Sequence, residues 1–233
     1  MIAGAKRGSF NITLSDTAGK PIYGAHEKIV FENFESLWTL HPEVEIDLCA
    51  MPVASLLQAA KEASKRFFYI SLDQSLLPTP TELDDMTMLE EVVMVGYPNG
   101  IWDRLNNMPI LRRGVTATNP NLDWNGKPEF LIDAACFPGS SGSPVFLFNQ
   151  GSYTTKSGGM RIGAPRLKLL GVLYAGPQHM ATGEIRVVAI PTIDKPISLT
   201  SIPNNLGMII KARKLQEIDD IFSARLIAEV ARQ

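Results

Sequence analysis

The sequence predicts an all-β protein that ends in a single α-helix. Short apolar runs recur along the chain, several of them alternating with polar residues at the two-residue period of a strand, and clusters of Gly, Pro, Asn and Asp separate them. After residue 213 the period changes to that of an amphipathic helix. Many short strands with one terminal helix indicate a β-barrel or β-sandwich architecture.

The composition is that of an ordinary globular chain and argues against some classes of partner. Of the 233 residues, 45% are hydrophobic and 20% are charged, and the formal net charge is −2. A chain of this length can bury a sizeable core, either as one two-lobed domain or as two small domains. Lys and Arg cluster only in short pairs, so we expect no nucleic-acid-binding surface.

The sequence carries no sign of a membrane anchor, a secretory signal or a prosthetic group. No apolar run reaches the roughly 20 residues of a membrane span, and the start of the chain does not resemble a signal peptide. Cys49 and Cys136 are far apart and the histidines are scattered, so we expect neither a disulfide framework nor a metal site. We therefore expect a cytoplasmic protein that needs no cofactor.

The first part of the chain is expected to form a hairpin, further short strands and one helix. Phe10, Ile12 and Leu14 fall on one face of a strand at 8–14, and turn residues follow it. Asp47 begins an otherwise uncharged run, where it either takes a partner, because burying a lone carboxylate is costly, or lies at a strand edge. The other elements expected here are a hairpin strand near 21–23, apolar or strand-like runs at 28–34, 44–52 and 67–70, and a helix within 54–66.

The second part is denser in strand signals and carries the terminal helix. Residues 73–85 contain Pro78 and Pro80 among scattered acids and look like a connection, so the lobe boundary is placed there. Residues 151–159 are rich in Ser, Thr and Gly and are expected to form an exposed loop. A strand that runs into a turn is expected at 91–100, and further strands at 111–118, 129–133, 144–149, 167–176, 184–190 and 205–210. The apolar stripe of the final helix is expected at Leu215, Ile218, Phe222, Leu226 and Val230.

The stretch 136–145 is the strongest candidate for chemistry. Gly139 and Gly142 frame a serine, and an apolar strand follows at once. Glycines allow backbone conformations in which peptide N–H groups converge, so Ser141 can act as a nucleophile beside donors that stabilise a developing negative oxygen. The alternative is a small-residue turn before a buried strand. A nucleophile elbow of the α/β-hydrolase kind does not fit, because Ser143 replaces its second glycine and a strand follows instead of a helix.

With this serine turn, the chain resembles the trypsin-like serine peptidases of the chymotrypsin fold. Within that family it is most similar to bacterial trypsin-like peptidase domains related to the high-temperature-requirement proteases, over most of residues 45–212. The turn at 139–145 is the most specific part of the resemblance, and Asp47–Pro52 resembles the segment that holds the family's catalytic acid. Weaker likeness extends to barrel and cleft strands at 95–100, 113–117 and 170–176.

The resemblance implies a two-lobed double β-barrel. Residues 1–75 correspond to the N-terminal barrel, residues 76–212 to the C-terminal barrel with the nucleophile, and residues 213–233 to the helix. The implied activity is hydrolysis of peptide bonds in a peptide or protein substrate, through an acyl-enzyme formed on Ser141.

The same resemblance implies roles for the site residues. Asp47 orients and stabilises a histidine base, and the N–H groups of Gly139 and Ser141 form the oxyanion hole. The number of positions between Asp47 and Ser141 is close to the roughly 93 of the chymotrypsin triad, which favours Asp47 over Glu43 or Glu45.

A substrate pocket is implied beside the serine. Ala135 stands six positions before the nucleophile, so no acidic pocket floor is present and a small or apolar residue next to the scissile bond is expected. The walls implied by the resemblance are Ala135, Cys136 and Phe137 on one side and Tyr174, Ala175 and Gly176 on the other.

The base histidine is the part of the triad that the resemblance leaves open. In the family it precedes the acid, and His26 is the candidate within this chain. His41 is only six positions before Asp47, and His179 follows the serine, in a turn expected at the surface or cleft rim. Residues 1–5 look like the segment that follows the family's histidine, so the base either lies upstream of this chain or is lost.

Either case predicts weak or absent peptidase activity, because an unassisted serine hydroxyl is a poor nucleophile. An N-terminal barrel cut short in this way is also expected to be incomplete, with open strand edges. Two other functions remain as alternatives. One is a catalytically silent, protease-like module that binds peptides or proteins through the same cleft, and the other is an unrelated all-β binding protein whose Gly-Ser turn is a coincidence.

Overall fold

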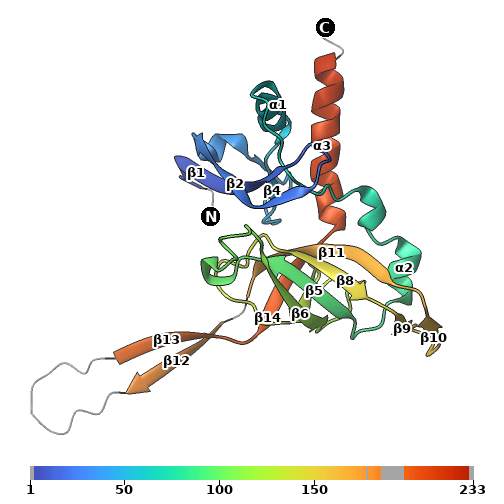
Figure 1. Ribbon diagram of the computed structural model, residues 1–233. Helices are drawn as coiled ribbons and strands as arrows, with labels where there is room; N and C mark the ends of the chain where they lie inside the picture. The colour runs from blue at the N-terminus through green and yellow to red at the C-terminus, as the bar shows by residue number, and fades with distance from the viewer. Residues whose placement is uncertain (1–2, 177, 185–196, 231–233) are drawn as a thin grey trace, which may run out of the picture.

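The computed structural model describes residues 3–176, 178–184 and 197–230. Most of the regular structure is strand, in agreement with the all-β prediction. Figure 1 shows a β-barrel, a smaller lobe built from the first third of the chain above it, and the C-terminal helix α3 (Arg213–Val230) running beside both.

The barrel is the centre of the fold. Six antiparallel strands close on themselves in the order β11-β14-β7-β6-β5-β8, and each strand expected within this region is present, with end points that differ by a few residues at most. The strands are β5 (Glu91–Gly96), β6 (Ile110–Thr116), β7 (Glu129–Asp133), β8 (Pro144–Asn149), β11 (Arg166–Ala175) and β14 (Leu206–Lys211).

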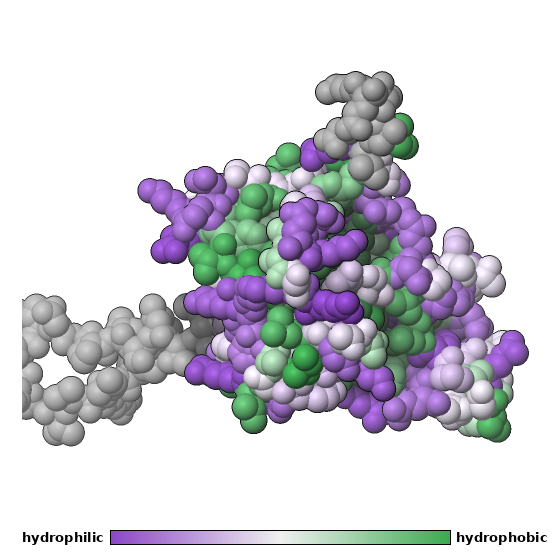
Figure 2. Space-filling view, turned by 45° about the horizontal axis from the view of Figure 1, so that its top comes forward, coloured by the Kyte–Doolittle hydropathy of each residue, from purple (hydrophilic) through white to green (hydrophobic). Residues whose placement is uncertain are grey.

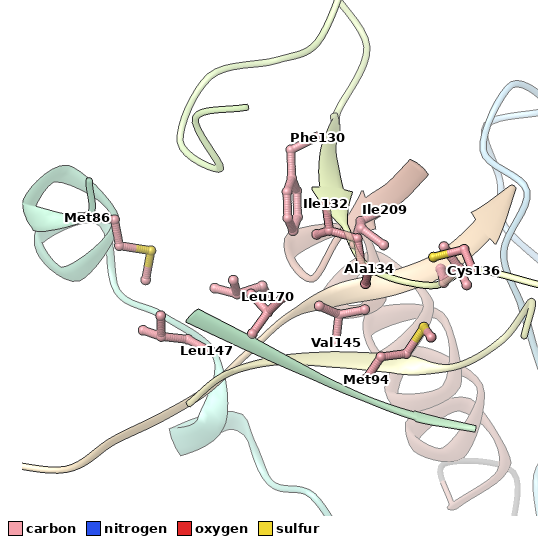
Figure 3. Close-up of a cluster of buried hydrophobic side chains, with 12 residues drawn as sticks. Met86, Met94, Phe130, Ile132, Ala134, Cys136, Val145, Leu147, Leu170 and Ile209 are labelled. Carbon is pink, nitrogen blue, oxygen red and sulfur yellow. The ribbon is translucent and has the colours of Figure 1, made fainter. Parts of the chain in front are cut away.

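The inward positions of these strands form the main hydrophobic core. Buried and partly exposed residues alternate along β5 and β8, as expected for strands with one face inside a barrel. Figure 3 shows Met94, Val145 and Leu147 among the side chains that converge inside, together with Ile132 and Ile209. Full burial of each such side chain stabilises the fold by about 1.5–3 kcal/mol.

The first lobe is a set of two-stranded sheets and not a second closed barrel in the part of the chain described. Its main unit is the predicted hairpin of β1 (Arg7–Ser15) and β2 (Pro21–Glu32), and β2 includes most of the apolar run expected at 28–34. The run at 67–70, expected to be a strand, makes only an isolated bridge between Phe67 and Leu14. The remaining elements are η1 (Phe34–Leu37), β3 (Thr39–Leu40), β4 (Cys49–Ala50) and α1 (Ala54–Glu62).

The connection between the lobes begins where expected. It contains η2 (Gln74–Leu76) and α2 (Pro80–Asp85), and α2 starts with a capping box between Thr79 and Glu82. The loop expected at 151–159 is confirmed as mostly exposed, but residues 152–154 of it form β9 (Ser152–Thr154), which pairs with β10 (Met160–Ile162) through a turn that contains Gly158 at positive φ.

A second ribbon leaves the barrel after β11. Strands β12 (Gln178–Glu184) and β13 (Ile197–Pro203) pair with each other and extend away from the body of the molecule (Figure 1). The strand expected at 184–190 lies outside the described residues except for Glu184.

A second hydrophobic cluster joins the first lobe, the barrel and α3. Ile46 and Leu48 pack with Ile210 of β14 and Ile218 of α3. Leu215 and Phe222 pack against the same cluster, which confirms the predicted apolar stripe of the helix for the side chains that the structure describes. No described helix combines the length and apolar character needed to cross a bilayer.

The visible face of the molecule has no broad apolar surface. Figure 2 shows polar and apolar side chains intermixed over that face. Exposed large apolar side chains occur in several separate parts of the chain, including Ile70, Leu105 and Ile162. Scattered residues of this kind are normal for a globular protein and do not by themselves indicate a function.

Asp123 forms ion pairs with the last strand of the barrel and with the start of α3. Its carboxylate contacts Lys211 Nζ at 2.8 Å and Arg213 Nη2 at 2.7 Å. Burial raises the pKa of Asp123, but the hydrogen bonds and charges of Lys211 and Arg213 outweigh it and bring the pKa below its usual value. A lowered carboxylate pKa contributes stability that is present above the unfolded-state pKa and is lost as the pH falls through the folded-state pKa.

We therefore expect the free energy of unfolding to fall as the pH is lowered from about 5 to about 3. Asp123→Asn should lower it by about 1–3 kcal/mol at neutral pH, since the buried Lys211 then loses its counter-charge. The variant should also lose less stability on acidification than the unmodified protein. Urea unfolding at several pH values measures both effects. Glu45→Gln, at an exposed position, is the control, and an equal acid response in both variants would contradict the assignment.

Candidate functional site

The serine turn consists of two successive tight turns. Ser140 N donates to Phe137 O at 3.0 Å, and Ser143 N donates to Ser140 O at 3.1 Å. The third residue of each turn is a glycine with positive φ, +86° at Gly139 and +88° at Gly142. These are the features of type II turns, in which glycine is the residue that adopts the required backbone conformation without strain.

Backbone hydrogen bonds hold the turn on both sides. Asn99 N, in the 3₁₀-helix η3 (Pro98–Gly100) after β5, donates to Pro138 O at 2.7 Å. On the other side, Gly142 N donates to Leu173 O of β11 at 2.7 Å, and Leu173 N donates to Ser143 O at 2.9 Å. The turn is therefore positioned by two separate parts of the barrel.

Two N–H groups in this turn have no acceptor in the part of the protein that the structure describes. Among the described residues, neither Gly139 N nor Ser141 N donates a hydrogen bond, whereas Ser140 N between them does. The side chain of Ser141 is exposed beside them. Peptide N–H groups without an acceptor, close in sequence to an exposed hydroxyl, suit an oxygen atom that carries negative charge, as in a carbonyl under attack.

The Ser141 hydroxyl itself is engaged with the backbone. Its Oγ donates to Tyr174 O, at the end of β11, at 3.0 Å. A peptide carbonyl accepts a hydrogen bond but is far too weak a base to remove the proton. The hydroxyl in this arrangement is held in place but is not activated.

The two implied pocket walls lie next to each other. A Cβ atom added to Gly176 would lie 3.8 Å from Cys136 Cβ, so the ends of the two segments are in contact. Burial raises the pKa of the Cys136 thiol to about 11, with the nearby charge of Arg112 opposing the rise, so the thiol stays protonated at neutral pH. Tyr174 presents its backbone oxygen to the serine, while its side chain packs against the cluster between the lobes.

Asp47 is exposed and lies on an irregular segment. The strand predicted over 44–52 is confirmed only for Cys49–Ala50. Its neighbours Ile46 and Leu48 point into the cluster between the lobes, which leaves Asp47 in solvent without need of a partner. Burial, Glu129 and Asp47 all raise the pKa of Tyr174, so the Asp47 charge acts on the Tyr174 hydroxyl. No hydrogen bond links Asp47 to Ser141 in the described structure.

The two histidines with described side chains have different surroundings. His26 is exposed on β2, opposite Thr13 of β1. His41 is buried: its Nδ1 accepts a hydrogen bond from Glu43 N at 3.1 Å, and its Nε2 lies 3.2 Å from Glu217 Oε2, without the alignment of a hydrogen bond. Neither imidazole hydrogen-bonds Ser141. The backbone of His179 is part of β12, but its side chain lies outside the described residues.

Sequence reasoning missed a cation at this end of the barrel. Arg112 Nη1 donates to Ala135 O at 2.8 Å, and the guanidinium carbon lies 4.9 Å from the centre of the Phe137 ring. The available signal was its position in β6, where alternation places Arg112 on the same face as Ile110 and Gly114.

No protein-family model, curated protein or solved structure matches this chain. The described residues also contain no group of three or more His, Cys, Asp or Glu side chains that could hold a metal ion.

Proposed function

We propose that this protein binds the carbonyl group of a peptide or protein at the serine turn and acts as a serine peptidase of low reactivity. The observation that carries the proposal is that Gly139 N and Ser141 N, in the same turn as the exposed Ser141 hydroxyl, have no acceptor among the described residues. In this proposal the barrel corresponds to the second lobe of a trypsin-like double barrel, and the hairpin lobe to a reduced first lobe.

The proposed reaction is acyl transfer to Ser141. Its Oγ bonds to the substrate carbonyl carbon, the carbonyl oxygen becomes an oxyanion held by the two N–H groups, and the C–N bond then breaks. The serine proton must pass to the departing amine, which is the task of a base in efficient peptidases. Because Ser141 Oγ donates to Tyr174 O and to no imidazole in the described structure, we expect slow turnover.

A fluorophosphonate probe tests the proposal, because it reacts with a serine hydroxyl placed beside an oxyanion hole. We expect slow, stoichiometric labelling of the protein, complete loss of labelling in Ser141→Ala, and unchanged labelling in Ser157→Ala, a serine in the turn between β9 and β10. Mass spectrometry of the digested protein locates the label. Labelling that persists in Ser141→Ala, or no labelling after prolonged incubation, would contradict the catalytic proposal.

A second candidate function is a catalytically silent module that binds peptides through the same turn. The hydrogen bond from Ser141 Oγ to Tyr174 O favours this function, because the hydroxyl proton is already donated to a backbone carbonyl. Peptide binding that is equal in the unmodified protein and in Ser141→Ala, together with no labelling, would support this function over the first.

A further inference from the structure

Arg112 is a charged residue on the inner face of the barrel. It lies directly opposite Met94 in the β5–β6 ladder, and Met94 is buried in the barrel core. Paired residues of neighbouring strands project to the same side of a sheet, so the Arg112 side chain starts inward and reaches the end of the barrel at Ala135 and Phe137.

The charge of Arg112 has no counter-ion in the described part of the chain. Arg113 and Arg166 form ion pairs with Glu91 and Glu90, whereas Arg112 forms none among the described residues. Its Nε is buried and donates to no acceptor that the structure describes. A half-buried guanidinium with an unpaired N–H is unfavourable unless something else satisfies it, because desolvating a charge is costly.

The guanidinium lies under the segment that leads into the serine turn. It is hydrogen-bonded to the backbone of Ala135 and stacked on Phe137, two residues before Gly139. The charges of Arg112 and of Asp133 both influence the pKa of the Cys136 thiol. Arg112 and Asp133 nevertheless form no ion pair with each other. The carbonyl site and this unpaired cation therefore belong to the same end of the barrel.

We propose that Arg112 selects peptides that carry a carboxylate close to the carbonyl group held at the serine turn. The carboxylate expected first is that of an Asp or Glu side chain. This inference rests on the proposed function and specifies its substrate class. Nε is buried and one N–H of Nη1 is taken by Ala135 O, but the second N–H of Nη1 and those of Nη2 have no acceptor among the described residues, and such paired donors match the two oxygens of a carboxylate. Ala135 is neutral, so position 135 alone indicates a small or apolar side chain, but the charge at this pocket comes from β6.

Binding of short labelled peptides tests the proposal without requiring turnover. Three fluorescein-labelled peptides of otherwise equal sequence are compared by fluorescence anisotropy: one with a central Glu and an amidated end, one with Gln in its place, and one with Gln and a free terminal carboxylate. We expect the Glu peptide to bind roughly ten-fold or more tightly than the amidated Gln peptide, the scale of a charged hydrogen bond in a partly buried site.

The variants isolate the role of Arg112. Arg112→Gln should remove the preference for Glu, and Arg112→Lys should retain part of it, which keeps the test decisive if the Gln variant folds poorly. Arg113→Gln is the matched control, since it removes the same charge from the outer side of the same strand and should leave the preference intact.

Each contrary result is specific. A Glu preference that survives in Arg112→Gln, or no preference in the unmodified protein, overturns the proposal. Tighter binding only of the peptide with a free terminal carboxylate overturns the side-chain form and assigns Arg112 to a chain end. Fluorophosphonate labelling of Ser141 uses an uncharged probe, so its failure beside a retained Glu preference would count against catalysis and not against the role of Arg112.

Discussion

Gly171→Ala is expected to lower the free energy of unfolding by about 3 kcal/mol or more, because the added methyl group has no space at the seam where the barrel closes. A Cβ at this position would lie 2.1 Å from Ile210 O and 2.7 Å from Ile209 Cγ2. The first of these atoms is backbone in the paired strand β14, so no change of side-chain rotamer relieves the contact. The pairing of β11 with β8 is already irregular between Leu169 and Gly171.

The measurement is chemical unfolding followed by circular dichroism, with Gly151→Ala as the control. A Cβ at Gly151 meets nothing within 4 Å and its φ is not positive, so the control should change stability by no more than a few tenths of a kcal/mol. Near-equal stabilities of the two variants would show that β11 and β14 are not held at this distance in solution.

The strands of the barrel were predictable because each has one face in the core. The alternation of apolar and polar residues in the sequence indicates which positions of each strand are buried and which are exposed. β7 and β8 begin and end where this pattern predicts. The order of the strands was not predictable in this way. β14 pairs with both β11 and β7, and such pairing of segments distant in sequence leaves no local signal.

The first lobe shows the opposite case. The apolar run at 67–70 resembles a strand, but only Phe67 bridges to Leu14, and Tyr69 and Ile70 remain exposed. Strand character depends on a neighbour with free N–H and C=O groups, which the sequence of the run does not specify. The strand expected over 44–52 is limited to Cys49–Ala50 for a related reason: the segment around Asp47 is irregular, so its two apolar neighbours turn inward while the carboxylate stays in solvent.

At the candidate site, composition and turn chemistry were sufficient to single out Ser141 and its glycines, whereas the contacts of the hydroxyl were not accessible. The hydrogen bond to Tyr174 O depends on the relative placement of the turn and the end of β11. The role of Arg112 depends in the same way on the pairing of β6 with β5, because the Met94 partner shows that the face shared by Ile110, Arg112 and Gly114 is the inside.

Gly139→Ala is expected to reduce the rate of fluorophosphonate labelling of Ser141 by about 100-fold, the scale associated with loss of one oxyanion donor. A Cβ on this residue would lie 3.0 Å from Tyr97 O and 3.2 Å from Asn99 N, both backbone atoms, and an alanine is strained at φ +86°. The turn must shift to accommodate the methyl group, which moves Gly139 N away from the position where the oxygen binds.

The control for this prediction must carry the same backbone strain at a different place. Gly158 has φ +84° and no atom within 4 Å of an added Cβ, and it lies in the turn between β9 and β10. Gly158→Ala should therefore cost about 1–2 kcal/mol of stability, as strain at a left-handed position does, without changing the labelling rate. Comparing labelling rates with unfolding free energies separates the two effects: if both variants lose stability and only Gly139→Ala loses labelling, the N–H of Gly139 acts on the reacting oxygen. Equal labelling of both variants would instead remove Gly139 from the site and leave Ser141 N as its remaining unpaired donor.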